Sequence, residues 1–190
     1  MSVKPKLIVL VASTRPGRVG STVGQWFSKY AAEHAGFGVE LVELENMNLP
    51  LFNEPHHPAM GNYVYQHTKD WSAKVASADA FVFVTPEYNF STPPSLTNAL
   101  TYLVNEWKYK PVGFVSYGGI SGGIRSVQDT KLALTTFKMV PMYEAVVIPN
   151  VGGFLDDNGN FLPKEIQEQS ATAMLDELLR WTKALASLRN

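Results

Sequence analysis

A short polar segment directly after an apolar run carries the residue types best suited to chemistry in this sequence. Pro86-Glu87-Tyr88-Asn89-Phe90-Ser91, called the second loop below, follows Ala80–Val84, which is typical of a buried strand. An aromatic side chain can lie against a flat heterocycle, and the Asn89 amide and backbone N–H groups can bond its polar edge. In open α/β sheets, ligands bind at the carboxyl ends of the strands. The segment is therefore a candidate site for a planar ligand, although Pro-x-x-Asn turns are common by themselves.

Another polar segment follows the first apolar run of the chain. This first loop, Ala12–Ser21, precedes a helical pattern and contains Ser13, Thr14, Arg15, Arg18 and Gly20. A helix N-terminus presents free N–H groups and partial positive charge, which suits a phosphate, and an arginine can add a forked contact. The alternative is a surface turn with incidental arginines. The pattern G-x-x-x-x-G-K-[ST] is absent from the loop, which argues against a kinase or ATPase.

A third candidate segment is rich in glycine. Gly118-Gly119-Ile120-Ser121-Gly122-Gly123, called the glycine loop, follows Ser116 and Tyr117 at the end of another apolar run. Glycine lets the backbone approach a planar ligand closely or take a positive φ. The spacing G-G-x-x-G-G differs from the dinucleotide fingerprint G-x-G-x-x-G and follows the fourth expected strand instead of the first, so a dinucleotide-binding turn is not indicated.

Strand and helix patterns alternate along the whole chain and place these loops. Apolar or alternating runs predict strands over residues 7–11, 39–44, 80–84, 111–117 and 143–148. Apolar residues at three- and four-residue steps predict helices over 23–34, 64–78, 96–107, 124–138 and 171–188. Gly36 and Gly38 are expected to end the first helix, and residues 46–62 are expected to form a long loop. The alternation predicts one domain, residues 1–190, with an α/β doubly wound sheet of five parallel strands in the flavodoxin-like order 2-1-3-4-5 and helices on both faces. All three loops then lie at one sheet edge.

Composition excludes several classes of function. The 190 residues are 45% hydrophobic and 17% charged, with a net charge of -1, so nothing indicates nucleic acid or a membrane as a partner. The absence of cysteine excludes disulfides and thiolate sites, and no apolar run approaches membrane-spanning length. We expect a cytoplasmic protein. We also expect no metal site, because His56 and His57 lack a third ligand at zinc spacing, and no hydrolase elbow G-x-S-x-G follows a strand.

Taken together, the three loops resemble the NADPH-dependent FMN reductase family, which includes NAD(P)H:quinone, azo and chromate reductases. The similarity extends from Leu7 to about Pro149. It is carried by Ser13-Thr14-Arg15-Pro16-Gly17-Arg18, Leu49-Pro50-Leu51-Phe52, Pro86-Glu87-Tyr88-Asn89 with Leu96 and Asn98-Ala99-Leu100, and the paired glycines 118–119 and 122–123. Four residues depart from those frequent in the family: Ala12, Pro94, Thr97 and Thr101. The resemblance therefore predicts the cofactor more strongly than it predicts substrate preference or assembly.

The resemblance implies FMN as cofactor, NADPH or NADH as electron donor, and ping-pong hydride transfer to a small acceptor: a quinone, an azo compound, chromate or free flavin. It implies a phosphate site at Ser13, Thr14, Arg15, Arg18 and Gly20. It implies ring contacts at Pro86, Glu87, Tyr88 and Asn89, with Phe90 and Ser91 close by, and at Ser116, Tyr117, Gly118 and Gly119 on the other ring edge. No side-chain acid or base is needed, so no catalytic residue is assigned. Two alternatives stay open: a reductase of free flavin, and a flavodoxin-like electron-transfer or flavin-binding module.

The family resemblance also implies a homodimer or homotetramer. Tyr102, Trp107 and Tyr109 cluster on and after the helix that follows the second loop. Such an aromatic cluster is either ordinary core or a subunit interface.

Overall fold

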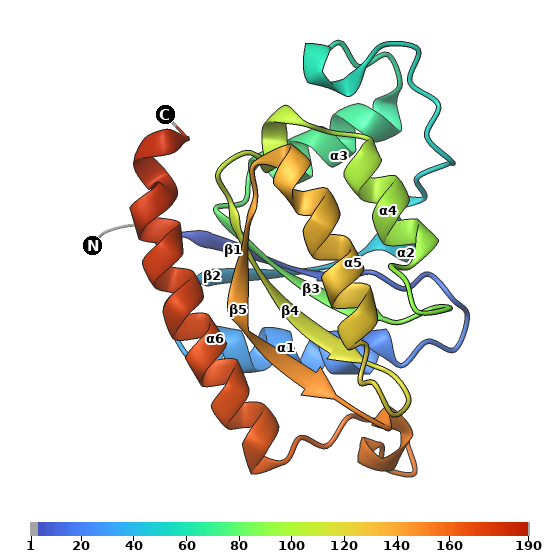
Figure 1. Ribbon diagram of the computed structural model, residues 1–190, viewed down its shortest axis with the longest axis vertical. Helices are drawn as coiled ribbons and strands as arrows, with labels where there is room; N and C mark the ends of the chain where they lie inside the picture. The colour runs from blue at the N-terminus through green and yellow to red at the C-terminus, as the bar shows by residue number, and fades with distance from the viewer. Residues whose placement is uncertain (1–3, 190) are drawn as a thin grey trace.

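The computed structural model describes residues 4–189, and its centre is a fully parallel sheet (Figure 1). The strands are β1 (Lys6–Val11), β2 (Gly38–Glu43), β3 (Ala80–Pro86), β4 (Pro111–Tyr117) and β5 (Val140–Ile148). Their order is β2-β1-β3-β4-β5, as the sequence predicts. β1 pairs with β2 on one side and β3 on the other. The chain therefore adds β2 on one side of β1 and the remaining strands on the other side, which makes the space between β1 and β3 the topological switch point. In such sheets the ligand crevice opens at this switch point, outside the carboxyl ends of the strands.

Helices cover both faces of the sheet (Figure 1). The helices are α1 (Gly20–Glu33), α2 (Leu44–Met47), α3 (Gln66–Ala76), α4 (Pro94–Thr101), α5 (Ile124–Leu134) and α6 (Glu165–Ala184). Short 3-10 turns occupy Pro58–Met60, Asn105–Trp107, Thr135–Phe137, Val151–Phe154 and Leu185–Leu188. Apolar residues of α1 and α6 pack in one core layer, and those of α3, α4 and α5 pack in the other.

The two core layers follow from the two-residue period of the strands. In β1, Leu7, Val9 and Val11 belong to the α1/α6 layer, whereas Ile8 and Leu10 belong to the opposite layer. Both sets are fully buried, which explains why the run is apolar at every position instead of alternating. The central strands therefore form a rigid platform whose carboxyl ends carry the loops.

The structure corrects several details of the sequence prediction. The helix after the second loop ends at Thr101, and Trp107 belongs to a separate 3-10 turn. The region 46–62 contains the end of α2 and one 3-10 turn. The left-handed residue after α1 is Ala35, with φ 64°, and neither Gly36 nor Gly38 has a positive φ.

The aromatic cluster is mainly core. Tyr102 and Trp107 are fully buried in the layer beneath α3 and α4, where the Trp107 ring packs edge-on against Trp71 at a centroid distance of 5.9 Å. Only Tyr109 stays half-buried. The interface interpretation is therefore wrong for Tyr102 and Trp107, because side chains without exposed area cannot meet a second subunit.

Candidate functional site

The first loop leaves β1 at Ala12, whose N–H donates to the Val84 carbonyl of β3. The loop turns at Gly17, which has φ 68°, and enters α1. The Arg18 guanidinium does not extend into solvent, because it pairs with the carboxylates of Glu43, the last residue of β2, and Glu45, in α2. Arg15 is exposed. The two arginines thus differ: Arg18 ties the loop to β2, and Arg15 is the accessible cation.

The second loop is a tight turn that closes on itself. Tyr88 and Ser91 exchange two backbone hydrogen bonds, of 3.2 and 2.9 Å, around Asn89 at φ 51° and Phe90 at φ 67°. Two consecutive left-handed residues define a type I′ turn. Asparagine tolerates this conformation, but it is unusual for a bulky residue such as phenylalanine. Strained backbone of this kind persists where surrounding contacts enforce it, and it is common at ligand sites.

A side-chain hydrogen bond joins these two loops across the switch point. The Tyr88 hydroxyl lies 2.7 Å from Ser13 Oγ. Ser13 is buried and Tyr88 is half-buried. The loops after β1 and β3 therefore form one wall, although 75 residues separate the two side chains.

Glu87 connects the second loop to the glycine loop and the start of α5. Its carboxylate accepts the Ser121 hydroxyl at 2.9 Å, the Arg125 N–H at 3.1 Å and Arg125 Nη1 at 2.9 Å. Burial alone would raise the pKa of Glu87, but the hydrogen bonds from Arg125 and Ser121 outweigh it and hold the pKa below its ordinary value. A carboxylate at a helix N-terminus is also favoured by the helix dipole. The Glu87 side chain thus links the second loop to the glycine loop and to the N-terminus of α5.

The glycine loop needs glycine at its last two positions. Gly122 and Gly123 have φ of 59° and 84°, and a Cβ on Gly123 would lie 2.9 Å from the Tyr117 carbonyl oxygen. The loop after β5 pairs with it, since the Val151 N–H donates to the Gly118 carbonyl at 3.0 Å. Tight backbone packing after β4 and β5 therefore fixes the position of the glycine loop at one side of the site.

These loops enclose a cavity of about 180 Å³ at the carboxyl edge. It is lined by Ser13, Arg15, Arg18, Val19, Pro86, Glu87, Tyr88, Tyr117, Gly118 and Val151. The volume is below the roughly 300–1,000 Å³ typical of a complete small-molecule site. The cavity therefore matches one part of a larger ligand.

Two buried polar atoms at this cavity lack a protein partner. The Tyr117 hydroxyl and Arg18 Nε are both inaccessible and complete no hydrogen bond of good geometry within the described residues, although the nearby Ser13 hydroxyl acts to lower the pKa of Tyr117. Leaving such groups unpaired costs roughly 1–3 kcal/mol each. Both are N–H or O–H donors beside the accessible Arg15, and burial raises the pKa of Tyr117, which keeps its proton in place. This donor set fits a phosphate or another oxyanion.

Not every predicted residue reaches the cavity. Thr14 lines a neighbouring hollow beside Leu49 and Ser95. Gly20 is buried under Tyr117, where a Cβ would lie 2.4 Å from the Tyr117 hydroxyl oxygen. The Ser116 side chain lines a groove between α5 and β5 on the other side of the sheet, because neighbouring strand residues face opposite sides. Asn89, Phe90, Ser91 and Gly119 are exposed.

The sequence analysis did not identify two residues that line the cavity, nor the ion-pair partners of Arg18 and Glu87. Val151 follows the fifth strand, so the edge rule that selected the other loops would have found it. Val19 occupies the N-cap position of α1. The partners Glu43 and Arg125 had no local signal, because each meets its counterpart through the fold.

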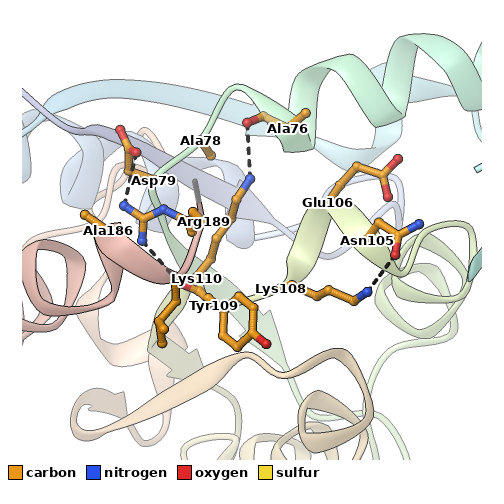
Figure 2. Close-up of a pocket in the computed structure, with 11 residues that line it drawn as sticks. Ala76, Ala78, Asp79, Asn105, Glu106, Lys108, Tyr109, Lys110, Ala186 and Arg189 are labelled. Carbon is orange, nitrogen blue, oxygen red and sulfur yellow. Dashed lines mark hydrogen bonds and ion pairs between the residues drawn. The ribbon is translucent and has the colours of Figure 1, made fainter.

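A larger cavity of about 520 Å³ lies at the opposite edge, where the strands begin (Figure 2). The Lys110 amine donates to the Val75 and Ala76 carbonyls at the end of α3, at 2.7 and 3.2 Å. Arg189 pairs with Asp79. Burial lowers the pKa of Lys110 to about 8, and the neighbouring Arg189 adds to this effect. These groups fasten a helix end and the C-terminal turn to the sheet, and none belongs to the carboxyl edge.

Within residues 4–189, no helix combines the length and apolar character required to cross a membrane. The same residues contain no group of three or more His, Asp or Glu side chains positioned to hold a metal ion.

Comparison with known proteins defines the class of this fold and site. The model of the NADPH-dependent FMN reductase family matches residues 5–153. An NAD(P)H-dependent FMN reductase of Schizosaccharomyces pombe is 38% identical over 152 residues, which cover 78% of this chain and 76% of that protein. The chain belongs to the NADPH-dependent FMN reductase family, and the expectation of an FMN- and NAD(P)H-dependent oxidoreductase is confirmed at that level.

More distant proteins extend the comparison. A quinone reductase of Pseudomonas putida is 27% identical over 191 residues and covers 96% of this chain and 97% of that protein. Among solved structures, the flavoenzyme NAD(P)H:(acceptor) oxidoreductase FerB of Paracoccus denitrificans superposes with a TM-score of 0.76 at 20% identity, covering 95% of this chain and 98% of that one. The latter likeness supports the flavodoxin-like fold.

Proposed function

We propose that this protein is an NAD(P)H:quinone oxidoreductase in which the carboxyl-edge cavity holds the phosphate end of FMN. The observation that carries the cofactor site is the pair of unpartnered buried donors, Tyr117 Oη and Arg18 Nε, beside Ser13 and Arg15. A phosphate would satisfy such donors, and the N-terminus of α1 adds backbone N–H groups and positive potential. Family membership supports FMN as the molecule that brings the phosphate.

The residues of the site position and shield the cofactor. When bound, FMN would supply the redox chemistry of the reaction, as hydride acceptor for NAD(P)H and electron donor to the acceptor. Ser13 and Arg15 bind its phosphate, and the rigid turn at Tyr88 and Asn89 orients its ring. The glycine loop lets backbone approach the other ring edge. No side chain of this site has to gain or lose a proton in the hydride step.

For the acceptor we propose a quinone, with donor and acceptor using the same site in turn. Relatives named quinone reductase cover nearly the full chain, which favours quinones over azo compounds, chromate or free flavin. The carrier alternative, a flavodoxin-like module, is disfavoured by the net charge of -1, because electron carriers commonly dock through charged faces. We propose the cytoplasm as the compartment.

A homodimer or homotetramer remains our proposal for assembly. Large apolar side chains are exposed in the segment between α2 and α3, including Leu51 at 85%, Met60 at 68% and Val64 at 48%. Exposed apolar area of this kind is typical of an interaction surface. Multi-angle light scattering at micromolar concentration tests the proposal, and a monomeric mass would contradict it.

The function is tested by the visible spectrum of the purified protein with FMN, before and after anaerobic NADPH. We expect bound flavin that bleaches promptly and recovers its colour when a quinone is added. Bound flavin that stays yellow would favour the carrier module. Absence of bound flavin would favour a reductase of free flavin.

A further inference from the structure

Arg125 lies where the second loop, the glycine loop and α5 meet, and the proposed cofactor site does not use it. Its Nη1 donates to Glu87 Oε1 at 2.9 Å. Its guanidinium carbon lies 4.2 Å from the centroid of the Phe90 ring. These three residues, called the Glu87–Arg125 clasp, hold the guanidinium plane in one orientation at the edge of the site.

The clasp leaves most of the guanidinium available. A guanidinium has five N–H donors, and the only side-chain hydrogen bond that the described residues provide to it is the one from Nη1 to Glu87. The Arg125 side chain is 49% exposed, whereas its partner Glu87 is only 8% exposed. The negative charge of the pair is therefore buried, and the positive charge faces solvent.

Glu87 balances the charge of Arg125 within the ion pair, but the neighbouring carboxylates leave the outer N–H groups of the guanidinium free. The nearest other carboxylate on α5, Asp129, is engaged by the Ser91 hydroxyl and the Thr92 N–H. The apolar side chains of Ile120, Ile124 and Phe90 are 87%, 46% and 69% exposed. The second loop and the start of α5 thus present a preoriented guanidinium together with exposed apolar side chains. Such a combination suits a phosphorylated nucleoside better than a small uncharged acceptor.

We propose that Arg125 binds a phosphate group of the dinucleotide electron donor, a role that rests on the proposed function and extends it to donor recognition. Two phosphates have the required chemistry: the pyrophosphate, which NADH and NADPH share, and the 2′-phosphate, which only NADPH carries. The stacked and ion-paired guanidinium offers its free N–H edge to either. Arg125 is a binding residue for the donor, separate from the FMN phosphate contacts at Ser13 and Arg15.

The test compares Arg125→Gln and Arg125→Lys with a matched control, Arg180→Ala. Arg180 is a 79% exposed arginine on α6 that pairs with Glu177, so its loss removes one positive charge away from the clasp. Steady-state kinetics with FMN-saturated protein give KM for NADPH and NADH. Calorimetry measures binding of 2′,5′-ADP and 5′-ADP without turnover, and fluorescence titration gives the FMN dissociation constant.

We expect Arg125→Gln to raise KM for NADPH at least tenfold with little change in kcat, Arg125→Lys to be intermediate, and Arg180→Ala to resemble the native protein. A parallel rise for NADH with weaker 5′-ADP binding supports the pyrophosphate as the bound group. A rise for NADPH alone with weaker 2′,5′-ADP binding supports the 2′-phosphate. Unchanged donor KM and unchanged ADP binding overturn the proposal, and so does weaker FMN binding as the sole effect. If the native protein itself is not bleached by NADPH, the proposed function fails instead, and the calorimetry still reports on Arg125.

Discussion

The Tyr117 hydroxyl is the residue-scale feature that most directly links structure to cofactor binding. It is buried without a partner among the described residues, which costs the unliganded protein roughly 1–3 kcal/mol. Tyr117→Phe removes that cost, so we expect a higher melting temperature without FMN. We also expect weaker FMN binding, because the hydroxyl would no longer meet the phosphate. Thermal unfolding with and without FMN measures both, and a variant that loses stability in the absence of FMN would contradict the assignment.

Gly20 provides a related prediction. A Cβ at this position would lie 2.4 Å from the Tyr117 hydroxyl oxygen, so Gly20→Ala forces the phenol to move. We expect Gly20→Ala to destabilise the protein and weaken FMN binding, and the added Tyr117→Phe change to recover most of the lost stability. A double-mutant cycle on the free energy of unfolding measures this coupling. Additive effects would show that the two residues act independently.

The two arginines of the first loop have different expected phenotypes. Arg15 is exposed beside the cavity, so Arg15→Ala should weaken FMN binding about tenfold and leave unfolding nearly unchanged, since a hydrogen bond to a charged group contributes roughly 1.5–3 kcal/mol. Arg18→Ala removes the partner of Glu43 and Glu45 and should also lower stability. Flavin titration and urea unfolding separate the two effects. Native FMN affinity in Arg15→Ala would refute the phosphate contact.

At the scale of elements, Glu87 fastens the turn of the second loop to the N-terminus of α5. Its lowered pKa means that the folded state favours the carboxylate. This contribution is present above the ordinary glutamate pKa and is lost as the pH falls through the lower, folded value. Glu87→Gln should remove that acid dependence and speed amide hydrogen exchange at residues 88–91, without altering exchange in α6. Native exchange rates in the second loop would contradict the anchoring role.

At the scale of the whole molecule, the ionisation of Lys110 should make the free energy of unfolding depend on pH in the alkaline range. Its folded pKa of about 8 lies below the ordinary lysine value. Between these two values the unfolded chain binds a proton that the folded protein lacks, so stability rises with pH. The neighbouring charges Arg189, Asp79 and Glu106 also contribute to this pKa.

The expected gain is at most about 1.4 kcal/mol per pH unit, between pH 8 and about 9.5. Tyrosine titration makes a separate contribution above that range. Urea unfolding of the native protein and Lys110→Met across this range isolates the lysine, because the variant should have a flatter profile. Parallel profiles for the two proteins would rule out this linkage.

Local patterns in the sequence were sufficient to predict the strands, their order and the edge at which the candidate site lies. Uninterrupted apolar runs indicate strands covered on both faces, and their alternation with helical patterns leaves few topologies open. The turn chemistry of Pro86 to Asn89 and of the paired glycines is also local, so these segments could be selected from their residue types alone. All of these features depend on neighbours within a few positions along the chain.

The set of side chains that share the cavity depends instead on long-range packing. Ser116 and Tyr117 are adjacent in sequence yet face opposite sides of β4. The end of helix α4 at Thr101 and the start of strand β5 at Val140, three residues before the predicted start, also depended on packing. Arg18 meets Glu43 across 25 residues, and Arg125 meets Glu87 across 38. Such pairs follow from strand register and helix placement, which bring distant segments together. The periodicity of residues along the chain cannot predict these contacts, because it depends only on near neighbours in sequence.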